Sequence, residues 1–434
     1  MAAPALQLAD LTVPVGEART LRRVLALALQ RTVQDFLATP TSTLAPGNRA
    51  LFQETARLLG EAARLDPRLP LRVVRPVTVS ALLRSWQGAV AAGGDVRGPN
   101  AWLREGCALV LLELAQLGAL PAAGVTLGRD AHGGLPSLRS PGAGFLLTPG
   151  PAIERLRLLP GRVELQAADQ AWTLDLAELP AQATAACTVT RPYMPIVPGI
   201  SLALADNHPL RDHEAHPDKQ GNALDLGGHA PGAWVDALRA AFALVDRYLP
   251  VLAQEMRLLL QLIVPVGWDA EKHLSASYRE ALGLLYLTLH PQPMTMTEAL
   301  IHEFQHNKLN AALHLDPLLH NAFSPLYRSP VRPDARPLHG VVLAVHAFQP
   351  VALLYRAMVD DGHPLAGNPA FLGRFARIVA MNRQGAATVL THARPTAAGA
   401  GLLAEMRALD GVMAGWQGAL PTLDGALPAH DEHG

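Results

Sequence analysis

Two histidines and a glutamate stand at a spacing that can bind a metal ion. The stretch His302-Glu303-Phe-Gln-His306 is an H-E-x-x-H motif. On an α-helix, residues four apart lie on one face about 6 Å along the axis, so both imidazoles can reach one ion at about 2.0–2.1 Å. Glu303 lies beside the first histidine, where it can act on a metal-bound water or on a substrate. The pattern therefore predicts a metal centre with Glu303 as its catalytic residue.

The residues around the motif predict an amphipathic helix. Pro291 and Pro293 end the preceding segment, Thr295 is the expected N-cap, and Glu298 follows three residues later as in a capping box. Apolar residues recur at helical spacing on one side, at Leu300, Ile301, Phe304 and Leu309. We expect this side to pack in the core and the two histidines to face a cleft. The alternative is a pair of structural histidines, in a chain that has 17.

Three regions of the chain differ in pattern. Residues 1–122 are mostly amphipathic helix, residues 123–204 carry short alternating runs typical of strands, and residues 205–434 hold the motif and return to helix. Short strands are expected before the motif helix, at Leu262–Val266, Leu274–Tyr278 and Leu282–Leu289. We expect an α+β, predominantly helical fold, with a zincin-like H-E-x-x-H helix beneath a small sheet and an N-terminal helical region.

The expected helices are bounded by Gly, Pro and Asp residues. In the first region they are Glu17–Ala38, Arg49–Leu65, Val79–Ala91 and Ala101–Leu117. In the last region Ala233–Leu260 should break at Pro250, and Leu338–Asp360 should be kinked at Pro350.

Composition excludes several classes of protein. Half of the 434 residues are apolar and the net charge is -1, so no broad surface for nucleic acid or an anionic membrane is expected. Cys107 and Cys187 cannot form a disulfide framework, and no basic-then-apolar segment follows Met1. The apolar run Cys107–Val125 contains polar residues and is typical of a buried helix and turn. We expect a cytoplasmic protein, and its oligomeric state stays open.

The third metal ligand decides between chemistries. A metzincin needs glycine at position 309 and histidine at position 312, where this chain has Leu309 and Ala312. A thermolysin-like site takes a glutamate from a following helix, but none occurs between Glu303 and Glu405. A simple zinc peptidase therefore lacks its usual third ligand.

Two histidines downstream offer a replacement. His339 and His346 are seven residues apart in an expected helix, on one face and displaced by about 10 Å. One ion can hardly bind both, so one would be a ligand and the other would lie beside the site. We favour His346, which lies inside the helix, over His339 near its start. Structural roles for both remain the alternative.

Several segments resemble one family. They are Ser275-Ala-Ser-Tyr-Arg279-Glu280, His302-Glu-Phe-Gln-His306-Asn-Lys308, Ser324-Pro-Leu-Tyr327 and Asp334-Ala-Arg336-Pro-Leu-His339-Gly. Over residues 195–360 the chain resembles the H-E-x-x-H proteins found with ribosomally made, modified peptides, described as peptide β-hydroxylases. The resemblance implies a peptide substrate and two cofactors, iron and 2-oxoglutarate.

The residues are compatible with that chemistry. Two histidines and one further ligand leave positions open on Fe(II) for 2-oxoglutarate and oxygen. The third ligand would be histidine, or a carboxylate from Glu303 or Glu298. The far carboxylate of 2-oxoglutarate needs a cation, for which Arg279 and Arg336 flank the motif. One alternative is a Zn(II) hydrolase with Glu303 as general base, and another is a binding protein with a structural metal.

Overall fold

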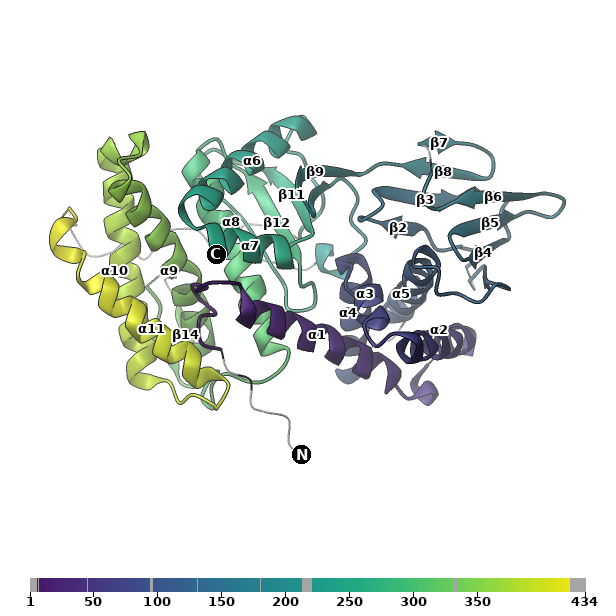
Figure 1. Cartoon of the computed structure of the whole chain (residues 1–434), viewed down its shortest axis with the longest axis horizontal. Helices are drawn as coiled ribbons and strands as arrows, with labels where there is room; N and C mark the ends of the chain where they lie inside the picture. The colour runs from purple at the N-terminus through teal and green to yellow at the C-terminus, as the bar shows by residue number, and fades with distance from the viewer. Residues whose placement is uncertain are drawn as a thin grey trace. The chain divides into compact units, whose positions relative to one another are not determined.

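The protein is α+β, about 51% helical and 17% strand, with its strands in small sheets. The computed structural model describes residues 6, 8–44, 46–93, 97–130, 132–179, 181–212, 221–330 and 334–421. It divides into two compact units. Figure 1 labels the helices and strands and colours the chain by residue number. Unit 1 comprises Met1–Leu25, Ile196–Ile200 and Glu214–Gly434, and unit 2 comprises Ala26–Pro195 and Ser201–His213. These boundaries lie elsewhere than the changes of pattern at residues 122 and 204.

Unit 2 combines a helical part with two antiparallel sheets. Its helices are α2 (Pro46–Leu65), α3 (Leu69–Val74), α4 (Val77–Ala91) and α5 (Arg97–Gln116), and α1 (Arg19–Leu37) is divided between the units. One sheet has the order β1-β4-β5-β6, from Val125–Gly128, Arg155–Leu159, Arg162–Gln166 and Ala171–Asp175. The other has the order β2-β3-β8-β7, from Leu138–Ser140, Phe145–Pro149, Cys187–Thr190 and Gln182–Ala183. The change from helix to strand was predicted, but α3 was not.

Unit 1 contains the motif. It contains two parallel strands, β11 (Leu262–Trp268) and β12 (Leu284–Leu289), in which Leu262 pairs with Leu284. Residues Ile196–Ile200, from β9 (Tyr193–Val197) and β10 (Ile200–Ala203), extend this sheet in the order β12-β11-β10-β9. All six residues of β12 are buried. A strand that is buried on both faces is typical of a sheet enclosed by helices.

The helices of unit 1 match most expectations. They are α6 (Pro231–Tyr248), α7 (Pro250–Leu259), α8 (Pro293–Leu313), α9 (Leu338–Asp360), α10 (Pro369–His392) and α11 (Gly399–Ala414). The break between α6 and α7 falls at Pro250, and α9 has the predicted ends with Pro350 inside it. By length and composition α9 could cross a membrane, but 78% of its most apolar window is buried inside the structure, as in a core helix.

An N-terminal segment, residues 8–18, is part of the core of unit 1. The side chains of Leu8, Leu11 and Thr12 are fully buried. The backbone N–H groups of Thr12 and Val13 donate to the carboxylate of Glu405 at 2.9 and 2.7 Å. Gly401 of α11 lies so close to this segment that a Cβ there would stand 2.9 Å from the nitrogen of Ala9. The absence of a side chain at Gly401 therefore lets the segment pack on the helix.

Candidate metal centre

Helix α8 begins three residues earlier than predicted from the expected N-cap at Thr295. Its first residue is Pro293 and its N-cap is Gln292, whose side chain makes no capping hydrogen bond. Proline is favoured at the first helical position because its missing N–H has no helical partner there. Glu298 does not cap the helix but is buried, and it accepts hydrogen bonds from the Tyr355 hydroxyl and from Arg374, the latter at 2.7 Å. The predicted capping box is therefore wrong.

The motif helix is buried on every side. Besides its apolar residues it buries polar ones, among them Glu298, His302, Glu303, Gln305, Asn307 and Lys308. The prediction of an amphipathic helix was wrong because several of these polar groups, such as Glu298, Asn307 and Lys308, find partners inside unit 1. The amide of Asn307 accepts from the Gly283 N–H at 2.8 Å and donates to the carbonyls of Ala281 and Leu284. Hydrogen bonding removes most of the cost of burying such groups.

The structure brings His302, Glu303 and His306 together as a candidate metal centre. Each offers one ligand atom, and these atoms lie within 4.8 Å of one another. The two imidazole rings are 4.2 Å apart between centroids, as expected for residues one helical turn apart. His302 also packs against the ring of Phe348 at 4.7 Å. His302 and Glu303 are buried, and the His306 side chain is 23% exposed.

Neighbouring residues orient Glu303. The Ser275 hydroxyl donates to Oε1 of Glu303 at 2.8 Å, and Oε2 lies 3.9 Å from Nδ1 of His306. Within the described part of the chain, Oε2 of Glu303 and Nε2 of His306 are buried without a hydrogen-bond partner. Burial lowers the pKa of His306, while the carboxylate of Glu303 partly opposes that shift. A neutral imidazole and a carboxylate with unused lone pairs fit a metal ion, because ligands must bind in the deprotonated form.

The two downstream histidines do not join this cluster. Among the described residues, no metal-binding group within that spacing includes His339 or His346. His346 is fully buried, and its Nδ1 lies 3.0 Å from the Thr12 hydroxyl. Burial, with Lys308 and His306 nearby, holds the pKa of His346 well below its usual value. His346 therefore contacts the N-terminal segment in this structure.

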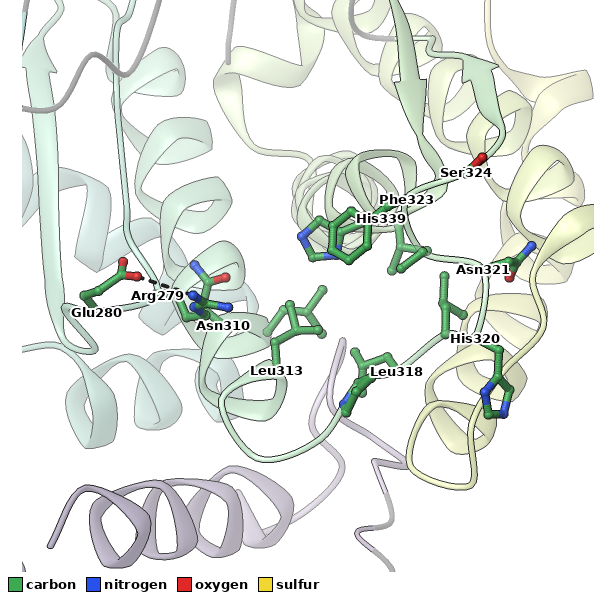
Figure 2. Close-up of a pocket in the computed structure, with 15 residues that line it drawn as sticks. Arg279, Glu280, Asn310, Leu313, Leu318, His320, Asn321, Phe323, Ser324 and His339 are labelled. Atoms are coloured by element: carbon green, nitrogen blue, oxygen red, sulfur yellow. Dashed lines mark ion pairs between the residues drawn. The ribbon is translucent and has the colours of Figure 1, made fainter. Parts of the chain in front are cut away.

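His339 lies at the start of α9, on the wall of a cavity of about 720 Å³. Its ring is 5.4 Å from that of Phe323, and Figure 2 shows it directed toward the side that carries Arg279 and Asn310. Burial lowers the pKa of His339, and the charges of His306 and Arg279 lower it further. Leu309, Asn310 and Leu313 of α8 also line the cavity, so it lies beside the part of α8 that follows His306.

The two candidate arginines differ in position. Arg279 lines the cavity, is 64% exposed, and lies 3.6 Å from the carboxylate of Glu280. Arg336 belongs to β14 (Ala335–Pro337), which pairs with β13 (Leu326–Arg328), and its Nε lies 2.9 Å from the Asp334 carboxylate. Arg336 is not among the described residues that line this cavity.

Sequence reasoning gave no role to several residues near the cluster. Ser275 holds Glu303 from a segment 28 residues away, and Arg374 binds Glu298 from α10, 76 residues away. His273 lines a narrow void of about 10 Å³ together with Ser275 and His302. No spacing in the sequence marks these residues, because only the folded chain brings them to α8.

No protein-family model matches the chain, and no curated protein matches it. We therefore infer the function from the residues of the site.

Proposed function

We propose that the chain is an iron- and 2-oxoglutarate-dependent enzyme that hydroxylates a β-carbon of a ribosomally made peptide. The observation that carries this proposal is the cluster of His302, Glu303 and His306. Two imidazoles and one carboxylate are the donor set of non-heme Fe(II) oxygenases. The family resemblance supports the same chemistry. With Glu303 as the third donor, the centre does not require His339 or His346 as a ligand.

Each residue has a defined task in this proposal. His302 and His306 bind the metal as neutral imidazoles, and Ser275 holds Glu303 in place through its Oε1. Iron supplies the oxygen chemistry when bound, and the reaction converts 2-oxoglutarate, oxygen and a peptide C–H into succinate, carbon dioxide and a C–OH group. Arg279 anchors the far carboxylate of 2-oxoglutarate. Its side chain lines the adjacent cavity and is 64% exposed, so a ligand can reach its guanidinium group. Arg336 is the alternative anchor.

The surrounding architecture fits this proposal. We propose that α8 beneath the β11–β12 pair is a zincin-like arrangement, in which the segment before β12 shelters the cleft. A cavity of about 720 Å³ has the size of ligand sites in general. Both free cysteines are buried, and we propose a reducing cytoplasmic setting, which suits ferrous iron.

A zinc hydrolase is the second candidate, and one observation favours it. Glu303 is fixed by Ser275 with Oε2 left over, as a general base on a metal-bound water would be. Zinc in a hydrolase takes three protein ligands and keeps the fourth position for water. If Glu303 is the base, the described residues offer no third ligand within the cluster. Because this third ligand is missing, we rank the hydrolase second.

Anaerobic purification and loading with Fe(II) test the proposal. We expect one iron per chain, and succinate formed from 2-oxoglutarate and oxygen at a rate that a cognate peptide increases. Glu303→Ala should abolish succinate formation in the iron-loaded protein. Peptide-bond cleavage by the Zn(II) form, with no succinate from the Fe(II) form, would replace the oxygenase with the hydrolase.

A further inference from the structure

The segment Leu274–Tyr278 lies along the outer side of β12. Ala276 exchanges both main-chain hydrogen bonds with Tyr286 of β12, each at 2.9 Å, in an antiparallel bridge. The Thr288 N–H donates to the carbonyl of Leu274 at 3.1 Å. A strand was predicted over this segment, and the structure has a single bridge with these flanking bonds. The segment therefore forms an edge of the unit 1 sheet.

In an extended chain, the main-chain N–H and C=O groups of successive residues point to opposite sides, so the residues next to Ala276 direct theirs away from β12. Because Ala276 faces β12, the N–H and C=O groups of Ser275 and Ser277 point to the opposite side. Within the described residues these groups make no main-chain hydrogen bond. Ser275 is buried, whereas Ser277 is partly exposed, and the hydroxyl oxygen of Ser277 is itself buried without a described hydrogen-bond partner. An edge with unused donors and acceptors is a template for another extended chain.

This edge is continuous with the metal cluster and with the large cavity. Ser275 binds Glu303 at 2.8 Å, and Arg279 and Glu280, just after the segment, line the cavity. Two charges of opposite sign give that end of the cavity no net charge. A chain that pairs with Ser277 would therefore pass the metal cluster and enter the cavity.

The cavity favours an apolar side chain. Its lining includes Leu309, Leu313, Leu318, Leu319, Phe323 and Val342. Phe323 is 72% exposed, although it belongs to this lining. A large aromatic side chain that stays exposed inside a concave apolar site is typical of a binding contact.

We propose that the peptide substrate binds as an added β-strand on the edge formed by Leu274–Tyr278, with an apolar side chain in the cavity against Phe323. The main chain of Ser277 supplies hydrogen bonds that do not depend on the sequence of the peptide, and the cavity supplies selectivity. This inference rests on the proposed function only in taking a peptide as the substrate. It holds for hydroxylation and for hydrolysis alike.

The test uses the full chain loaded with Zn(II), without 2-oxoglutarate, so that binding is measured apart from turnover. A linear random peptide library is selected on this protein, and the tightest peptide is the probe. Each of its backbone amides is then methylated in turn. We expect a loss of affinity of tenfold or more at every second residue and little loss between, because β-strands pair through alternate residues.

Variants of the protein test the same contact between the peptide and the edge by changing Ser277 and Phe323. Ser277→Pro removes the outward N–H, and proline is tolerated at a sheet edge. It should weaken probe binding at least fivefold more than Ser277→Ala, which keeps the N–H. Phe323→Ala should weaken binding about tenfold, whereas Leu65→Ala, an exposed apolar residue of unit 2, should not change it.

Three results would overturn the inference: no peptide selected, no alternation in the methylation scan, or equal effects of the two Ser277 variants. If Ser277→Pro does not fold, the methylation scan on the unaltered protein decides. Alternating peptide binding with no succinate from the iron form would remove the proposed hydroxylation and leave this inference standing.

Discussion

Burial sets the protonation of the imidazole at His306. Its pKa is lowered by burial, and the neighbouring Glu303 carboxylate only partly restores it. At neutral pH the ring therefore stays neutral and can donate a lone pair to a metal. His302 and His306 could be predicted as metal ligands from their spacing, because two residues four apart on a helix lie on the same face. The contact of Ser275 with Glu303 could not, because it depends on how a distant segment folds back.

Removing either motif histidine should abolish metal binding. We expect His302→Ala and His306→Ala to lose stoichiometric iron or zinc, with affinity reduced 100-fold or more, because two donors cannot hold the ion as three do. Metal content after dialysis and circular dichroism measure binding and fold. His320→Ala, an exposed histidine of the cavity wall, should keep the metal. Unchanged metal content in both motif variants would refute the site.

A single carboxyl group should make unit 2 less stable as the pH rises. Burial raises the pKa of Glu113 in α5 from 4.5 to about 7. The folded state then binds the proton more tightly than the unfolded state, so the stability is full below pH 4.5 and decreases until about pH 7. The difference amounts to roughly 3 kcal/mol.

Glu113→Gln should remove this dependence. Denaturant unfolding at pH 5 and at pH 8, followed by a signal from unit 2, compares the two proteins. We expect the variant to be the more stable at pH 8 and to lose less stability between the two pH values. An unchanged slope in Glu113→Gln would exclude this carboxyl group as the cause.

At the scale of elements, the ends of helices were predicted correctly where residues next to those ends determine them. The ends of α9 and the break at Pro250 follow from Pro and Gly residues and from apolar periodicity. Prediction failed for α8, whose polar residues looked like a solvent-facing side. They are buried because other elements supply partners: Glu255 of α7 for Lys308, and the loop before β12 for Asn307. A single sequence does not show such long-range pairs.

Replacing one partner of the buried pair Lys308–Glu255 should lower the free energy of unfolding strongly. Replacing both by apolar residues should lower it much less. The two groups are 2.7 Å apart and both fully buried. Burial lowers the pKa of Lys308 and raises that of Glu255, and each partner opposes the other's shift. Lys308→Met leaves a buried carboxylate and should cost about 3–5 kcal/mol.

The double variant Lys308→Met/Glu255→Leu should recover most of that loss, since two apolar side chains need no partner. Chemical denaturation of the single and double variants gives the coupling. If both are equally destabilised, packing and not charge pairing holds α7 against α8.

At the scale of the whole molecule, unit 1 is assembled from distant parts of the chain. The N-terminal segment lies against α11, and Thr12 contacts Glu405, 393 residues away, as well as Gln305 of α8 and His346 of α9. The sequence offered no sign of this, because residues 8–16 lie outside every predicted helix and strand. The two-unit division could not be derived from changes of pattern for the same reason.

The N-terminal segment should therefore stabilise the unit that holds the motif. Leu11 is fully buried, so Leu11→Ala should cost about 2–5 kcal/mol of unfolding free energy. Val15 on the same segment is 74% exposed, and Val15→Ala should change stability by less than about 0.5 kcal/mol. Thermal and denaturant unfolding measure both. Equal stability of the two variants would mean that the segment is dispensable for unit 1.

The contact between Thr12 and Glu405 has a consequence for synthesis on the ribosome. Domains generally fold as units while the chain emerges. Most of unit 2 is contiguous, from Ala26 to Pro195, and is complete before α8 is made. The segment around Thr12 emerges before unit 2, yet its partner Glu405 is translated 393 residues later than Thr12. The metal cluster can therefore reach its native surroundings only after Glu405 has been translated, so that a chain stalled before α11 would carry the motif without its finished site.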